Sequence, residues 1–154
     1  MKKTVVAPGV GSERELFEDS EKVAEHAHSK TVAVEQPGHV RLYISGHVPL
    51  EDGSVQTEDI GEQTRIVLEQ IQSHLERFDG SMNDVVRMRV YVTDLNDADF
   101  RTVHEIRSEF FDRDHHPSST LVEIADLTRD GAKIEIDADA IVPEDGWDVT
   151  VIEE

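Results

Sequence analysis

The stretch HHPSSTLVEIADLTRDGAKIEIDADAIV, residues 115–142, decides the fold, because it predicts two β-strands joined by a turn. In the first strand, Ser119, Leu121 and Glu123 alternate with a second set of side chains that is partly apolar. In the second strand, over residues 132–140, small or branched apolar residues alternate with Lys133 and carboxylates. The segment TRDG between them has the composition of a turn. Two such strands predict a sheet with one apolar face.

Three further strand regions lie upstream. Residues 27–34 and 40–50 are β-favouring runs that flank the turn QPGH, and this arrangement predicts a hairpin. Another strand is predicted over residues 84–94, DVVRMRVYVTD, where every second residue is apolar. Its alternation places on one face Val86, Met88, Val90 and Val92.

Two amphipathic helices are predicted between these strands. Residues 57–79 carry apolar side chains at steps of three and four, with Thr57 as the N-cap and a Gly at the end. The second helix is predicted over about 98–111. Its apolar stripe consists of Phe100, Val103, Ile106, Phe110 and Phe111.

The chain therefore predicts one domain, residues 26–142, between an irregular N-terminal arm, 1–25, and an acidic C-terminal tail, 143–154. The order of elements indicates an α+β fold, a mixed β-sheet with two helices on one face. The other face is expected to carry Arg41, Tyr43, Arg87, Arg89, Tyr91, Ser119, Glu135 and Asp137. Its aromatic and arginine content favours a subunit interface. The alternative is a sheet that is open to water on this face.

The charge balance is strongly acidic, with 34 Asp and Glu against 15 Lys and Arg and a net charge of −19. Because the carboxylates are dispersed, they favour a halophilic protein that works in concentrated salt, where self-repulsion is screened. An ordinary acidic cytoplasmic protein is the alternative. This surface would repel nucleic acid and anionic membranes, so neither is an expected partner.

Composition excludes several other classes. Cysteine is absent, which excludes disulfides, thiolate metal sites and cysteine nucleophiles. No apolar run approaches the roughly 18 residues of a transmembrane helix. The two lysines near the start are not followed by a hydrophobic signal region, so a cytoplasmic location is expected.

The chain contains six diagnostic segments in this order: ISGHVPL, DIGEQTRIVLEQIQSHL, VVRMRVYVTDLND, VHEIRSEFF, HPSSTLVEIADL and KIEIDADAIV. Together, and in this order, they resemble the Rid family, the reactive intermediate deaminase group (RidA/YjgF) that is also named after an endoribonuclease, L-PSP. The resemblance covers about residues 28–142, and it implies a chorismate-mutase-like subunit. It also implies a homotrimer whose sheets face the trimer centre, with three small-metabolite clefts between subunits and no cofactor.

The resemblance also implies a set of site residues. In deaminases of the family, a glutamate on the last strand holds the water that attacks an imine carbon, and this glutamate corresponds to Glu135. An arginine just after the HP dipeptide binds the substrate carboxylate, and its position is taken by Ser119. The remaining cleft positions correspond to His28, where the family has tyrosine, His104, where it has asparagine, the Ser45-Gly46 pair, and Leu121.

The replacement of arginine by Ser119 affects substrate choice. A guanidinium grips a carboxylate through two charge-assisted bonds, whereas a hydroxyl offers one neutral bond, a loss of about 2–5 kcal/mol. Reduced activity on 2-imino acids is therefore expected. Whether Arg41, Arg87, Arg89 or a protonated histidine compensates stays open.

Three functions follow as hypotheses. The first is a hydrolytic deaminase of imines or enamines with altered substrate choice, in which Glu135 is the general base. The second is a non-catalytic trimer that binds a small metabolite, with Glu135 as one more outward carboxylate. The third, a ribonuclease, is disfavoured because no basic groove is evident.

The histidines raise the question of a metal site. His26, His28, His104 and the pair His115-His116 supply possible ligands together with Glu135, but they lack compact ligand spacing. No metal site is therefore expected. His47 and His74 are expected at the edge of the core and on a helix surface.

Overall fold

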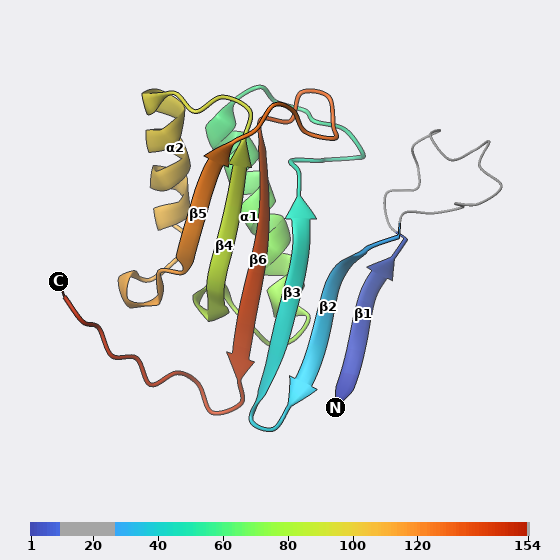
Figure 1. Ribbon diagram of the computed structural model, residues 1–154, viewed down its shortest axis with the longest axis vertical. Coiled ribbons are helices and arrows are strands. Elements are labelled where there is room, and N and C mark those ends of the chain that lie inside the picture. Colours follow the sequence, from blue (N-terminus) through green and yellow to red (C-terminus); the bar gives the residue numbers. More distant parts are fainter. Residues whose placement is uncertain (10–26, 154) are drawn as a thin grey trace.

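A computed structural model describes residues 1–9 and 27–153, which form a six-stranded sheet covered by two helices (Figure 1). The strand order is β1-β2-β3-β6-β4-β5, and β4 and β5 run parallel whereas the other neighbours run antiparallel. The strands are β1 (Lys2–Pro8), β2 (Ser29–Gln36), β3 (His39–His47), β4 (Val85–Val92), β5 (Ser118–Glu123) and β6 (Ile134–Pro143).

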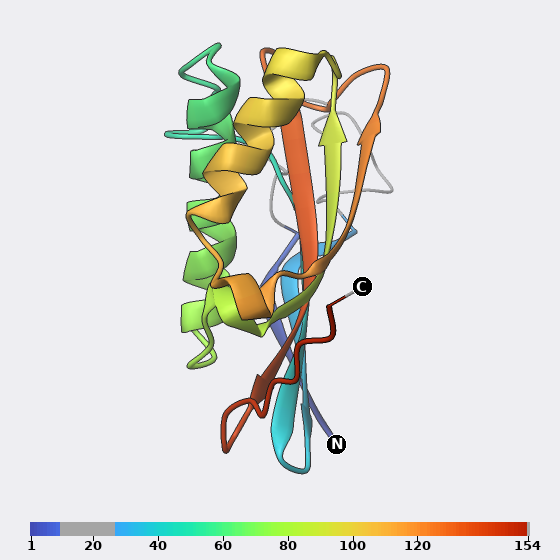
Figure 2. The ribbon, with the colours of Figure 1, turned by 90° about the vertical axis from the view of Figure 1, so that its left-hand side faces the viewer.

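Both helices, α1 (Ile60–Glu76) and α2 (Asp97–Ser108), pack on the same face of the sheet, which is seen edge-on in Figure 2. Between sheet and helices lies a continuous apolar core, in which Leu42, Leu68 and Ile136 are completely buried. Short 3-10 turns, η2 (Met82–Asp84) and η3 (Arg113–His115), precede β4 and β5. The predicted α+β class, mixed sheet and one-sided helices are confirmed.

The start of α1 differs from the prediction. The helix begins at Ile60, and its N-cap is Asp59, whose carboxylate accepts from the backbone N–H of Glu62 at 2.8 Å. Thr57 lies two residues before this N-cap, and its hydroxyl accepts from the Asp59 N–H and donates to Glu62. Asp59 takes the cap position because its short carboxylate accepts from the free N–H groups of the first turn.

Two strand predictions need correction. Val86 is 38% exposed, and Val85 takes its place in the core, because a register shift against β6 lies between Val85 and Arg87. The predicted irregular arm is wrong for its first residues, since β1 pairs antiparallel along β2. The rest of that arm, 10–25, lies outside the described residues, as does His26. Among the described residues, no helix is long and apolar enough to cross a bilayer.

Candidate active site

Glu135 lies on β6, between β3 and β4, and its side chain is half-buried on the face of the sheet opposite the helices. A β-carbon at Gly46 would collide with the Glu135 carboxylate, coming within 2.8 Å of Cδ. Glycine is therefore the residue that lets this carboxylate lie against β3. Burial, and then the negative charge of Asp137, raise the pKa of Glu135 above its usual value.

A bulge in β3 positions Gly46. The pairing of β3 with β6 shifts between Ile44 and His47, so Ser45 and Gly46 stand outside the regular ladder. The Ser45 hydroxyl donates to the Ser29 carbonyl at 2.6 Å, and the His47 Nδ1–H donates to the Ser45 carbonyl at 2.7 Å. The bulge is thus held on both sides by hydrogen bonds.

Behind the bulge, His47 and His74 are both buried, with ring centroids 4.9 Å apart. His74 forms a 2.8 Å hydrogen bond with the hydroxyl of Thr31, which is completely buried in β2. The expectation that His74 lies on a helix surface is wrong, because its turn of α1 faces the sheet.

An ionic network lies beside Glu135 on the same face. Arg89 pairs with Asp137, and its other nitrogen reaches Asp139 at 2.8 Å. Tyr91 donates to Asp137 across a longer 3.4 Å contact. Because these carboxylates engage Arg89, this guanidinium does not serve as a free carboxylate-binding group.

Ser119 lies on the opposite face from Glu135. In the parallel pairing of β4 and β5, Ser119 stands beside Met88, which is completely buried under the helices. The prediction that Ser119 shares the open face with Glu135 is therefore wrong. The orientation follows from Leu121, which packs against the core. Because residues two apart in a strand point to the same face, Ser119 faces the helix side as well.

Arg107 of α2 reaches Ser119, a contact that was not predicted from the sequence. Its Nη2 donates to the Ser119 hydroxyl at 2.9 Å. The residue is only 7% exposed, and burial lowers the pKa of the guanidinium. A signal was present in the sequence, because Arg107 follows Val103 by four residues and so interrupts the buried stripe of the helix.

His28 and His104, the two predicted cleft histidines, do not lie on β6, the strand that carries Glu135. His104 is on the surface of α2 with its ring centroid 4.5 Å from that of Phe100, and partial burial followed by the charge of Arg107 lowers its pKa. His28 precedes β2, and its carbonyl accepts from the Gly9 N–H at 2.8 Å. No group of three or more potential metal ligands occurs within residues 1–9 and 27–153.

Within one chain, the predicted residues thus form two groups. Glu135, Ser45 and Gly46 lie where β3 meets β6, whereas Ser119, Leu121 and His104 lie around β5 and α2. Strand β4 stands between β6 and β5. The structure does not bring Glu135 and Ser119 together in a single subunit.

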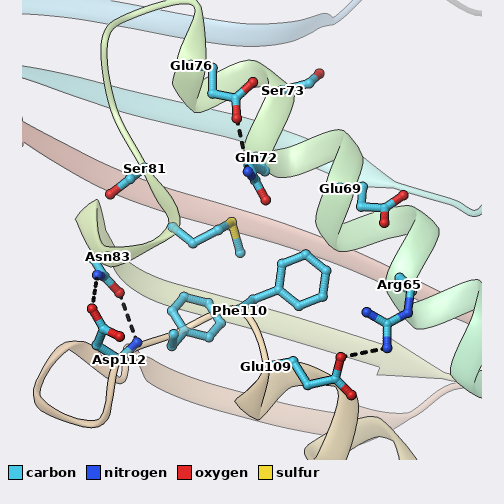
Figure 3. A pocket seen from close by; sticks show the side chains of 12 residues that line it. Arg65, Glu69, Gln72, Ser73, Glu76, Ser81, Asn83, Glu109, Phe110 and Asp112 are labelled. Atoms are coloured by element: carbon cyan, nitrogen blue, oxygen red, sulfur yellow. Dashed lines mark hydrogen bonds and ion pairs between the residues drawn. The ribbon is translucent and has the colours of Figure 1, made fainter.

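A surface pocket of about 690 Å³ lies elsewhere, between α1, η2 and the segment that follows α2 (Figure 3). Its polar groups are largely paired with one another, as Arg65 is with Glu109 at 2.7 Å and Asn83 with Asp112 at 2.7 Å. It contains none of the predicted site residues, so it is not the candidate site.

Comparisons with known proteins give matches over more than half of this chain. The family model described as Endoribonuclease L-PSP matches residues 20–142. A 2-iminobutanoate/2-iminopropanoate deaminase of Salmonella typhimurium is 35% identical over 130 residues, 73% of this chain and 98% of that protein. A RutC family protein of Pyrococcus abyssi is 39% identical over 91 residues, 58% of this chain and 69% of that protein. The crystal structure of a YjgF family member from Mycobacterium tuberculosis, 28% identical, covers 92% of this chain and 100% of its own with a TM-score of 0.68.

Proposed function

Because this chain belongs to the RidA/YjgF (Rid) family, we propose that it is a hydrolytic deaminase of reactive imine or enamine metabolites. The observation that carries the proposal is Glu135, a half-buried carboxylate with a raised pKa that lies against Gly46. Groups with pKa values shifted by burial and by a neighbouring charge concentrate at functional sites. The Salmonella relative is named for the same reaction class.

The proposed reaction converts an imine and water into a carbonyl compound and ammonia. The Glu135 carboxylate accepts a proton from water as the water oxygen attacks the imine carbon, and the C=N electron pair moves to nitrogen. Glu135 returns this proton to the nitrogen, which gives a neutral carbinolamine. The carboxylate then takes the proton of the new hydroxyl group and passes it to the nitrogen, so that ammonia leaves as the C=O bond forms. A raised pKa suits both steps, because the protonated acid then gives its proton back at neutral pH.

We further propose that the active unit is a homotrimer with clefts between subunits. Tyr43 and Val122 on the open face are 46% and 39% exposed, and aromatic and apolar side chains of this kind are typical of interfaces. The separation of Glu135 from Ser119 within one chain also supports this assembly, since a cleft between two copies could combine them. Substrate choice is proposed to differ from that of relatives with an arginine at this strand position.

The net charge of −19 argues against RNA as the substrate. It supports instead a protein that acts in the cytoplasm of a cell with concentrated salt. The name of the family model describes other members and does not by itself assign RNA cleavage to this chain.

The direct test is ammonia release from imines generated from amino acids by an amino-acid oxidase, measured above spontaneous hydrolysis. We expect acceleration by the wild type, loss of most of it in Glu135→Ala, and unchanged rates in Glu69→Ala, an exposed glutamate of α1. Equal rates for the wild type and Glu135→Ala would remove Glu135 from the mechanism. Saturable ligand stabilisation without any acceleration would favour the non-catalytic metabolite-binding trimer.

A further inference from the structure

Arg107 is a buried cation without a partner of opposite charge among the described residues. It is 7% exposed, and no carboxylate within residues 1–9 and 27–153 lies within ion-pair distance of it. Its single hydrogen bond goes to the neutral hydroxyl of Ser119, and its Nε has no hydrogen-bond partner in the part of the chain that the structure describes.

Such a group is costly to bury. Charged side chains inside proteins are normally paired, because an isolated charge loses hydration that nothing in the protein replaces. Leucine or methionine at position 107 would continue the buried stripe of α2 without this cost. A guanidinium kept there, in a chain with 34 acidic residues of which none pairs with it in the described region, indicates that its counter-anion comes from outside the chain.

Ser119 connects the buried Arg107 guanidinium to the surface of the protein. Strand β5 is the edge strand of the sheet, and Ser119 is exposed there. Because its oxygen accepts the Arg107 hydrogen bond, its own hydrogen is free to donate to a ligand. A small anion at this edge would receive hydrogen bonds from the guanidinium and from the hydroxyl.

We propose that Arg107 and Ser119 together form a binding site for a small carboxylate. A guanidinium presents parallel N–H groups that match the two oxygens of a carboxylate. This inference rests on the proposed function and extends it: in an imine deaminase, the site would hold the carboxylate of a 2-imino acid. The guanidinium of this site is supplied by α2, whereas the family resemblance implies an arginine on β5. The absence of an arginine at position 119 therefore does not exclude 2-imino acids as substrates.

The test uses pyruvate, a 2-oxo acid that needs no catalysis, and its neutral analogue pyruvamide. Binding is measured by NMR titration at constant ionic strength, so that general screening does not change between samples. We expect the wild type to bind pyruvate and to bind pyruvamide far more weakly. Arg107→Met should weaken pyruvate binding by about 30-fold or more, the usual loss when a charged contact is removed. Equal binding of the two ligands, or undiminished pyruvate binding by Arg107→Met, would overturn the proposal.

A second pair of variants keeps Arg107 in place. Ser119→Asp supplies a built-in carboxylate, so it should raise the melting temperature and abolish pyruvate binding. Its matched control is Ser118→Asp, which adds the same charge on the neighbouring residue, whose side chain is on the opposite face. Equal effects of the two substitutions on pyruvate binding would contradict a specific site.

An arginine introduced on β5 should restore pyruvate binding when Arg107 is removed. The double variant Arg107→Met with Ser119→Arg should recover pyruvate binding, whereas Arg107→Met with Ser118→Arg should not. If Arg107 instead pairs with an acidic residue of a second copy, Arg107→Met will change the sedimentation mass and leave pyruvate binding unaltered, which would overturn the proposal. If pyruvate binding depends on Arg107 but the protein does not accelerate ammonia release, the proposed function is contradicted and the carboxylate site is retained.

Discussion

At the scale of single residues, burial raises the pKa of the Glu135 carboxylate, and the neighbouring Asp137 raises it further. A general base works only when ionised, so turnover should fall as pH drops through that raised pKa. The acid limb of the rate profile is therefore expected above pH 4.5, the ordinary value for a glutamate.

Asp137→Asn tests this coupling. Removing the negative charge lowers the pKa of Glu135, so the variant should keep its activity to lower pH than the wild type. The measurement is kcat/KM for ammonia release between pH 4 and 8, with Asp139→Asn as a control that also loses a carboxylate from Arg89. An acid limb that stays in place, or moves to higher pH, would contradict the role of Asp137.

His74 makes a second residue-scale prediction, on stability. Burial, and then the positive charges of His47, Arg77 and Lys30, lower its pKa from 6.5 to about 4. Below pH 6.5 the unfolded chain takes up a proton that the folded protein excludes. Stability should therefore be full above pH 6.5 and fall as the pH drops towards 4, by at most roughly 3 kcal/mol from this group.

Urea unfolding at a series of pH values measures this loss. In His74→Gln the dependence between pH 6.5 and 4 should be weaker than in the wild type. The surface variant His116→Gln should leave it unchanged, because His116 is exposed. An identical pH dependence in the wild type and His74→Gln would show that another group governs acid unfolding.

At the scale of elements, the bulge of β3 determines where Glu135 lies. Gly46→Ala would place a methyl group into the Glu135 carboxylate and displace it. Because misplacing a reacting group by about 1 Å costs on the order of 100-fold in rate, we expect a loss of that size with the circular dichroism spectrum retained. The rate of ammonia release measures it.

A double variant separates displacement from other effects. If Gly46→Ala acts only by moving Glu135, then adding Gly46→Ala to the Glu135→Ala variant should cause no further loss of rate, because the carboxylate that it would move is already absent. Additive losses would mean that Gly46 contributes to catalysis independently of Glu135.

At the scale of the whole molecule, the charge of −19 should make stability depend on salt. Repulsion between dispersed carboxylates is screened over about 10 Å at 0.1 M salt and about 3 Å at 1 M. We expect the melting temperature to rise with KCl and to continue rising above 1 M, as in a halophilic protein. A plateau near 0.3 M would favour the ordinary acidic protein.

The open face of the sheet makes a further prediction about assembly. The wild type should sediment at three times the chain mass of 17.3 kDa. Tyr43→Glu should shift it to smaller species, because a buried unpaired charge at an interface is unfavourable. Leu95→Glu, at a residue that is 38% exposed outside the strands, should not do so. A trimer that is unaffected by Tyr43→Glu would exclude this face as the interface.

The sequence by itself determined the features that depend on local periodicity. The alternation in β6 placed Glu135 opposite Ile134 and Ile136, and steps of three and four residues indicated both helices. These patterns are readable because each side chain follows the geometry of its own strand or helix.

Only the tertiary structure decided the features that depend on contacts between distant segments. The register shift in β4 exchanged Val86 for Val85 in the core, and the parallel pairing with β5 turned Ser119 away from Glu135. The same packing of α2 against β5 brought Arg107 to Ser119. Register and contact across the sheet are set by the joint fit of residues from several elements, and no local pattern specifies that fit.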